Sequence, residues 1–327
     1  MKKKVIWILL LILLLVGAYF SLTIGTLPIS SKDLYQFFSG NASYAQQLII
    51  LDFRFPRLLI SILAGIGLSI SGYLFQSVTH NELADPGILG INSGAGLTVL
   101  IYLSFFSSSD TSWGLPLIAC LGSFVAAALI YFFGRQAHRL APNRILIAGV
   151  AVNAGISALT LISTVRASSN SYQLVTSWLS GTIWGTTWQH VFLLLPWLLI
   201  LLPIILIKGR QLEVLELGDE TAIGLGIKLK RTQMTFLFCG VCLAAVSVAM
   251  AGSISFIGLI APHIARTISG KKNNTTLLLT GFIGAVLLLF SDIIARVIVT
   301  NGELSTGIIV SIIGAPYFVF QLLRPKY

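Results

Sequence analysis

Charged residues are scarce in this 327-residue chain, and their scarcity excludes a large class of proteins. Asp, Glu, Lys and Arg together make up 10% of the sequence, whereas hydrophobic residues make up 56% and the mean hydropathy is +0.91. A soluble globular domain carries charge on roughly a quarter of its residues. The chain therefore cannot be a soluble globule. Its apolar runs continue for about 20 residues without alternating, which excludes a β-barrel and predicts an all-α, polytopic membrane protein.

Cysteine and the common catalytic motifs are equally scarce. The three cysteines all fall within apolar runs, so no disulfide framework is indicated. Cys239 and Cys242 have the spacing of a redox pair, but no basic neighbour favours a thiolate, and we interpret them as packing residues. A phosphate-binding loop of the form G-x-x-x-x-G-K-[ST] is missing, and no nucleophile or metal-ligand constellation lies within the spans. We therefore predict no enzyme activity, no cofactor and no metal in this chain.

Acidic residues are outnumbered by basic ones, 11 to 21, which gives a net charge of +10. No nucleic-acid motif accompanies this charge, and the cytoplasmic excess of Lys and Arg in membrane proteins explains it. With the N-terminus inside, 16 of the 21 basic residues fall in cytoplasmic loops. This asymmetry predicts that both termini are cytoplasmic. The basic residues left on the outer side are Lys32, Arg54, Arg57, Arg166 and Arg296.

Ten apolar segments are candidates for crossing the bilayer. The second segment carries Gly65, Ser69 and Gly72 on one helical face, a stripe of small residues that lets membrane helices approach closely. The ten segments cover residues 5–22, 56–79, 92–107, 114–134, 145–165, 190–207, 233–251, 254–268, 276–298 and 304–323.

Residues 208–233 form the one sustained polar stretch, here called the polar island. It holds nine of the 32 charged residues, which lipid cannot solvate, so it must lie in water at one membrane face. Its glycines predict short helices joined by turns, with a small apolar face of Val214, Leu217, Ala222 and Leu225. Such a surface fits a docking site for a soluble partner, and a solvated connector is the alternative.

Three local signals add detail. Ser30 or Ser31 can cap a short outer helix that ends at Gly40. Pro262 is expected to bend or end the eighth segment, presenting His263 and Arg266 to the cytoplasm.

Asp292 is the third signal, an acidic residue inside a predicted span. Intramembrane carboxylates are frequently functional, and a proton site is therefore one hypothesis. Arg296 stands four residues later, on the same helical face, and a local ion pair explains Asp292 more simply.

Three long stretches resemble the iron-siderophore, haem and cobalamin permease family of ATP-binding-cassette importers, the type II importers. They are RFPRLLISILAGIGLSISGYLFQSVTHNELADPGILGINSGAGL at 54–97, LELGDETAIGLGI with GSISFIGLIAPHIAR between 215 and 266, and SDIIARVIVTNGELSTGIIVSIIGAPYFVFQLLR at 291–324. The resemblance covers essentially the whole chain. It implies a single transmembrane domain over residues 1–327 with about ten helices, in the cytoplasmic membrane of a bacterium.

The resemblance also implies partners. A second permease, identical or paralogous, would complete a dimer in the lipid bilayer. Two cytoplasmic ATPases would bind ATP and Mg, and an extracytoplasmic binding protein would deliver the substrate. The polar island corresponds to the family's coupling region.

Particular residues match the family's functional positions. Those that would face the ATPase are Glu216, Gly218, Asp219, Ala222, Leu225 and Gly226; those that would dock the binding protein are Arg54, Arg57 and Arg296; those at an inner constriction are Asn81 and Leu83. Two departures stand out: His80 and Glu82 replace the Arg and Pro common in the family's turn, and the loop NGELST lacks the usual prolines.

We therefore predict the permease subunit of an ATP-driven importer that moves an iron chelate by alternating access, with a ferric siderophore as the first hypothesis. Haem and cobalamin remain alternative substrates. A proton-coupled secondary transporter that uses Asp292 is the alternative from a different class.

Overall fold

The computed structural model describes residues 2–25, 27, 29–87, 89–105, 111–135, 142–165, 169–270, 274–299 and 304–323. These residues form helices and connecting loops, without a β-strand. The helices are α1 (Lys2–Thr23), α2 (Ser31–Phe38), α3 (Tyr44–Leu48), the π-helix η1 (Ile49–Arg54), α4 (Phe55–Thr79), α5 (Ile91–Phe105), α6 (Thr111–Gly134), α7 (Pro142–Val165), α8 (Ser169–Leu179), α9 (Trp188–Ile207), α10 (Gly209–Leu215), α11 (Asp219–Gly224), α12 (Leu229–Ala251), α13 (Ile257–Ser269), α14 (Asn274–Ile298) and α15 (Thr306–Leu323).

The predicted all-α membrane fold is confirmed. Each of the ten apolar segments contains one helix, namely α1, α4, α5, α6, α7, α9, α12, α13, α14 and α15. Within the described residues, seven helices are long and apolar enough to cross a membrane. The other three, α5, α13 and α15, are shorter.

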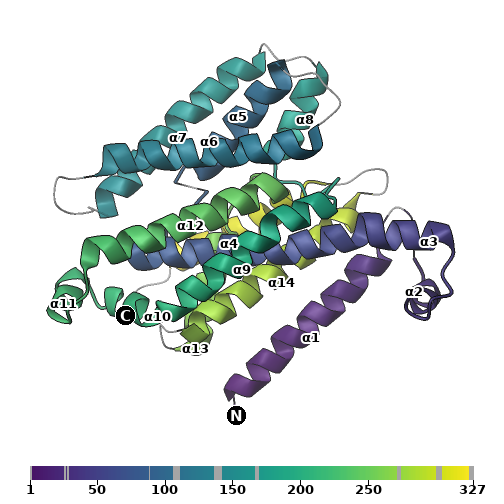
Figure 1. Cartoon of the computed structure of the whole chain (residues 1–327), viewed down its shortest axis with the longest axis horizontal. Coiled ribbons are helices and arrows are strands. Elements are labelled where there is room, and N and C mark those ends of the chain that lie inside the picture. Colours follow the sequence, from purple (N-terminus) through teal and green to yellow (C-terminus); the bar gives the residue numbers. More distant parts are fainter. Residues whose placement is uncertain are drawn as a thin grey trace.

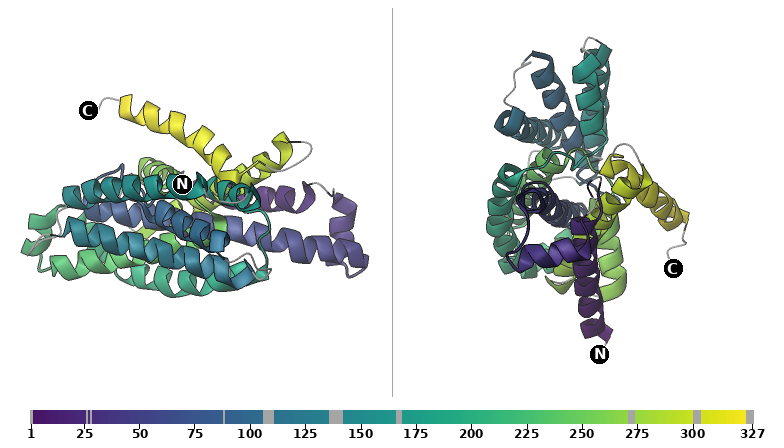
Figure 2. Two further views of the ribbon diagram at one scale, coloured as in Figure 1. Left: turned by 90° about the horizontal axis from the view of Figure 1, so that it is seen from above. Right: turned by 90° about the vertical axis from the view of Figure 1, so that its right-hand side faces the viewer.

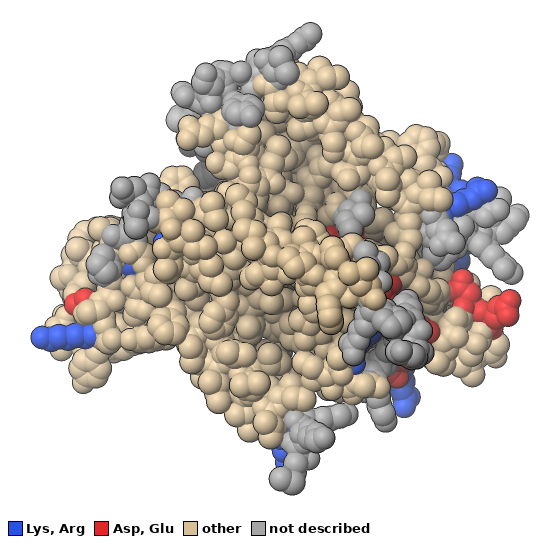
Figure 3. All heavy atoms as spheres, turned by 180° about the vertical axis from the view of Figure 1, so that it is seen from behind, with Lys and Arg blue, Asp and Glu red and all other residues tan. Residues whose placement is uncertain are grey.

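The long helices α4, α9, α12 and α14 run roughly along the long axis of the molecule (Figure 1). The short helices α10 and α11 lie at one end of this axis, and α2 and α3 lie at the other (Figure 1). A second group, α5 to α8, packs along one side, and α15 leans away from the bundle (Figure 2). Charged side chains are sparse over the centre of the face in Figure 3 and gather towards its margins, as a membrane-embedded surface requires.

Helix α4 is the most buried of the long apolar helices and packs against α9, α12, α13 and α14. The predicted stripe of small residues makes this packing possible. A Cβ atom added at Gly65 would lie 2.5 Å from the carbonyl oxygen of Gly284, and one added at Gly72 would lie 1.9 Å from that of Gly258. Backbone therefore meets backbone along α4, and glycine is the residue that fits there.

Pro262 was expected to bend or end its helix; it does not end it, because α13 continues through it to Ser269. Proline lacks the N–H that would bond the carbonyl four residues earlier, here that of Gly258. The side chain of Gln76 on α4 replaces this donor, with Nε2 3.1 Å from the Gly258 oxygen. Gln76 is 3% exposed, so the hydrogen bond is made inside the bundle.

The predicted short helix is confirmed as α2, with Ser30 as its N-cap. The Ser30 hydroxyl and the Asp33 carboxylate form a capping box, and Gly40 follows the helix with a φ of 79°. The hydrogen bond from the Ser30 hydroxyl, 2.7 Å long, is the main reason that the pKa of Asp33 is lowered. The outer loop is thus an ordered structure.

The glycine packing of α4 leads to a stability prediction. Gly72→Ala should destabilise the protein by roughly 1–3 kcal/mol, because the added methyl group overlaps the Gly258 carbonyl and must push α4 and α13 apart. The matched control is Gly155→Ala in the membrane helix α7, where an added Cβ meets no described atom within 4 Å. Thermal unfolding followed by size-exclusion chromatography in detergent measures both variants. Equal unfolding temperatures for the two variants would contradict the prediction.

Candidate functional site

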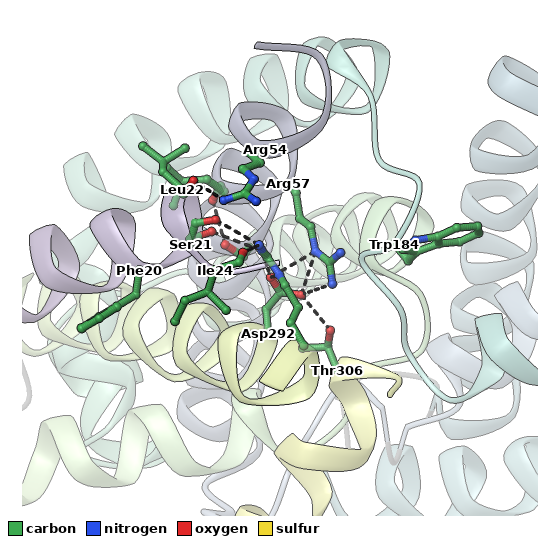
Figure 4. A network of polar contacts seen from close by, with 12 residues as sticks. Phe20, Ser21, Leu22, Ile24, Arg54, Arg57, Trp184, Asp292 and Thr306 are labelled. Carbon is green, nitrogen blue, oxygen red and sulfur yellow. Dashed lines mark hydrogen bonds and ion pairs between the residues drawn. The ribbon is translucent and has the colours of Figure 1, made fainter. Parts of the chain in front are cut away.

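An arginine cluster surrounds Asp292 near one end of α14. It comprises Arg54, Arg57 and Arg296, which are 6%, 8% and 9% exposed, and Asp292 itself is fully buried. Arg57 binds Asp292 in a forked arrangement, with Nε 3.1 and 3.2 Å from the two carboxylate oxygens and Nη2 2.9 Å from Oδ1. Arg296 donates from Nε at 3.0 Å and also from Nη2 (Figure 4). Thr306 donates its hydroxyl to Oδ1 at 3.1 Å.

The ion pair predicted between Asp292 and Arg296 is therefore confirmed, and the sequence reasoning missed its two other partners. Two guanidinium groups and a hydroxyl group engage both carboxylate oxygens. A buried carboxylate needs such partners to remain charged. This arrangement favours a structural role for Asp292 over a proton site.

Two of these arginines, Arg54 and Arg296, cap the C-terminal end of α1. The guanidinium of Arg54 donates to the carbonyl oxygens of Leu22 and Leu27. Arg296 donates from Nη1 to the Ser21 carbonyl oxygen at 3.0 Å. These carbonyl groups belong to the last turn of α1 or follow it, where intrahelical donors run out and positive charge is favourable. The cluster thus joins α1, α4 and α14.

A pocket of about 280 Å³ opens beside the cluster and is lined by all three arginines. Trp184 lies on its other side (Figure 4). None of the described residues that line this pocket carries a carboxylate, and three of them are arginines. This cationic lining suits an acidic side chain.

The polar island lies at the other end of the molecule (Figure 1). It folds as α10 and α11, joined by glycine turns as the sequence predicts. Gly218 has a φ of 106° and Gly226 a φ of 83°, backbone conformations that L side chains rarely adopt. The exposed apolar side chains are Leu217, Ile223 and Leu225, which are 65%, 49% and 63% exposed.

Ala222, which was expected to face a partner, has no exposed surface and supports α11 from within. Glu216 also points inwards, and its Oε1 accepts a hydrogen bond of 2.5 Å from Ser77 on α4. Asp219 lies at the start of α11, where Oδ1 contacts His80 Nε2 at 3.3 Å and Gln233 Nε2 at 3.1 Å. Both acidic residues therefore tie the polar island to the inner end of α4.

The turn after α4 contains the expected constriction residues. His80 caps α4 in a left-handed conformation with a φ of 50°, and the Oδ1 atom of Asn81 accepts a hydrogen bond of 2.9 Å from the backbone N–H of Leu83. Leu83 is 36% exposed. The departure at His80 therefore has a structural partner, because this side chain pairs with Asp219.

A further group of residues links these inner elements and was not singled out from the sequence. Besides bonding Gly258, Gln76 accepts a hydrogen bond from Arg266 on α13, and the Arg266 guanidinium lies 5.7 Å from the centre of the Tyr73 ring. Arg266 was expected to reach the cytoplasm, but it is half-buried against α4. Tyr73, Gln76 and Ser77 share the last two turns of α4 at helical spacing, a signal that could have identified them.

No group of three or more His, Cys, Asp or Glu side chains that could hold a metal is found in the part of the chain that the structure describes. What the structure does contain is a cationic pocket at one end, a partly exposed helical pair at the other, and one buried helix joining them. These features define a helical membrane protein with a polar site at each end of its bundle.

Comparison with known proteins gives the family. Residues 12–324 match the FecCD transport family, to which the chain therefore belongs. The chain is 38% identical to the iron(3+)-hydroxamate import system permease protein FhuG of Bacillus subtilis (strain 168), over 99% of this chain and 98% of that protein. It is 35% identical to the iron-uptake system permease protein FeuC of the same organism, over 100% and 98% of the two chains.

A solved structure agrees with these relatives. It is described as an inward-facing conformation of a metal-chelate type ABC transporter, and it matches 98% of this chain and 99% of its own with a TM-score of 0.84 and 27% identity. The family resemblance inferred from the sequence is confirmed, and the relatives are named as permeases. The chain is thus an integral protein of the bacterial plasma membrane.

The arginine cluster leads to a coupling prediction. Asp292→Asn should destabilise the protein by about 3–5 kcal/mol, because it removes the buried negative charge that both guanidinium groups engage. Adding Arg57→Gln should cost less in this background than in the wild type, because the charge interaction between Arg57 and Asp292 has already been removed. Thermal unfolding of the wild type, both single variants and the double variant measures the coupling. Strictly additive costs would contradict it. Asp33→Asn, in the exposed capping box, is the control.

Proposed function

We propose that this chain is the permease subunit of an ATP-binding-cassette importer for an iron chelate, with a ferric siderophore as the substrate class. The observation that carries the proposal is the end-to-end match to permeases named for iron(3+)-hydroxamate and iron uptake. The Fe(3+)-citrate permease YfmE of Bacillus subtilis (strain 168) matches 98% of the chain at 37% identity and points to the same substrate class. A second permease subunit, identical or paralogous, completes the pathway.

ATP hydrolysis is coupled to transport through the polar island. This chain supplies the translocation pathway and its gates, while two separate cytoplasmic ATPases bind ATP and Mg. The exposed apolar side chains of Leu217, Ile223 and Leu225 form the face that these ATPases contact. This assignment places the polar island and both termini on the cytoplasmic side, in agreement with the distribution of basic residues.

Glu216 connects this face to the interior. A displacement of α10 acts directly on α4, because Ser77 and Glu216 are hydrogen-bonded. Movement of the polar island during alternating access would therefore be passed to α4 through this contact.

The arginine cluster serves the outer face. An acidic side chain of the extracytoplasmic binding protein would enter the cationic pocket beside Arg54, Arg57 and Trp184. Such desolvated charge contacts steer association and fix its orientation. Asn81 and Leu83 remain the proposed inner constriction, where the turn after α4 folds back towards α5.

Uptake by the complete importer in proteoliposomes tests the proposed function. The permease, its ATPases and the binding protein would be supplied in turn with a ferric hydroxamate, ferric citrate, haem and cobalamin. We expect ATP-dependent uptake of a ferric chelate that continues when an uncoupler removes the proton gradient. Uptake of haem or cobalamin alone would overturn the substrate class, and uptake that stops with the uncoupler would favour the proton-coupled alternative.

The glycine turns of the polar island lead to a prediction about coupling. Replacing Gly218 and Gly226 with Leu forces left-handed backbone on L side chains, at about 1–2 kcal/mol each, and should reshape the docking face. We expect membrane insertion to persist while ATP-driven uptake is largely lost. Gly224→Leu is the matched control, because Gly224 lies in the same island at an ordinary φ with no described atom near its Cβ position. Normal uptake by the double variant would remove these turns from the mechanism.

The cationic pocket leads to a prediction about docking. Arg54→Gln removes a cation that is not paired with Asp292 and should weaken the binding protein's affinity about tenfold, equivalent to about 1.4 kcal/mol. The dependence of this affinity on salt should also decrease. Surface plasmon resonance with the immobilised permease measures both quantities, and Lys32→Gln on the exposed helix α2 is the control. An affinity of the wild-type protein that does not change with salt would contradict the electrostatic mechanism.

A further inference from the structure

A second cationic cavity lies at the junction of α9, α10 and α12, apart from the arginine cluster. It encloses about 370 Å³, and the charged side chains that line it are Lys208, Lys228 and Arg231. The amide of Gln211 and the hydroxyl-bearing Thr232 complete its polar lining. No acidic side chain is found among the described residues that line it.

The three cations are not neutralised by the protein. Across the described ranges, none of their side chains forms an ion pair or a hydrogen bond. Of the four acidic residues in the polar island, Glu216 binds Ser77 and Asp219 binds His80 and Gln233. The other two, Glu213 and Glu220, do not line the cavity and form no ion pair among the described residues. Three unpaired positive charges around one cavity create a local potential that attracts an anion.

The position of the cavity indicates where this anion comes from. Lys208 directly follows the membrane helix α9, and Lys228 directly precedes the membrane helix α12. The cavity therefore lies at the depth where spanning helices leave the hydrocarbon, which is the level of the lipid headgroups. A phosphate group of the bilayer is available at this depth without diffusion from solution.

An apolar surface leads into the cavity. Ile200 and Ile204, which are 60% and 36% exposed, precede Lys208 at intervals of four residues, and the backbone N–H of Lys208 donates to the Ile204 carbonyl oxygen at the end of α9. This spacing places them along one helical face. Ile207, next to Lys208, is 83% exposed. A lipid-facing apolar stripe thus ends at a group of unpaired cations, which matches the division of a phospholipid into acyl chains and a charged headgroup.

We propose that this cavity binds an anionic phospholipid, with the phosphate among Lys208, Lys228 and Arg231 and an acyl chain along α9. The ammonium and guanidinium groups would donate to the phosphate oxygens, and the Gln211 amide would donate to the headgroup. A carboxylate of a soluble partner is the competing occupant. The lipid is favoured because a partner outside the membrane cannot cover the stripe formed by Ile200 and Ile204. Bound here, the lipid braces the base of the polar island against the membrane.

Native mass spectrometry of the full-length chain, purified in detergent and supplied with either phosphatidylglycerol or phosphatidylcholine of the same acyl composition, tests this site. We expect phosphatidylglycerol to be retained at least about tenfold more strongly, as three interfacial cations predict. The combined variant Lys208→Gln, Lys228→Gln and Arg231→Gln should lose this preference. The combined variant Arg210→Gln and Lys230→Gln removes neighbouring exposed cations that do not line the cavity and should keep it.

A charge-conserving variant distinguishes loss of positive charge from misfolding as the cause of a lost lipid preference. Lys208→Arg with Lys228→Arg should still prefer phosphatidylglycerol, because the positive charge is unchanged. Equal retention of the two lipids by the wild type, or an unchanged preference in the three-residue Gln variant, would overturn the proposal. Displacement of the lipid by inorganic phosphate would show a free-anion site, and loss of the ATPases from the three-residue Gln variant in lipid-free detergent would show a protein contact. Either result would also overturn it.

Discussion

The need to satisfy every polar group without water organises this structure. Inside a bilayer an unpaired backbone group or charge costs several kcal/mol, so each departure from a plain apolar helix needs a partner from elsewhere in the chain. Pro262 leaves the Gly258 carbonyl group without its helical donor, and Gln76 supplies one. Asp292 is buried completely, and Arg57 and Arg296 surround it. In both places one partner comes from α4, namely Gln76 and Arg57.

Helix α4 therefore connects the two functional ends physically. Arg57 lies in its first turn, within the arginine cluster, and Ser77 lies in its last turn, bonded to the polar island. The intervening residues are almost all buried, and glycines bring α13 and α14 into backbone contact with it. This close packing makes α4 a continuous structural link between the residue that contacts Glu216 and the arginine cluster.

Periodicity and composition predicted the fold well, because long apolar runs allow few alternatives in a membrane. All ten segments were found as helices, and the glycine turns of the polar island followed from residues that favour positive φ. Local reasoning also identified the Asp292–Arg296 pair, since both residues share one helical face. The contacts with Arg57, 235 residues away, and with Thr306 depend on how helices pack, which spacing within one segment does not encode.

The same distinction explains the errors. Pro262 was expected to stop or bend α13 because a proline removes a local donor, and no local pattern shows that Gln76 on another helix replaces it. Ala222 was assigned to a surface by its place in an apolar pattern, yet α11 turns it inwards and exposes Leu217 and Leu225. His80 departs from the family's turn, but its contact with Asp219 becomes intelligible only when the polar island folds against α4. When an ion pair or a hydrogen bond links distant segments of the chain, only the tertiary structure identifies the partner residue. In this protein such long-range contacts lie at the two ends of α4, next to the two surfaces that are proposed to bind partner proteins.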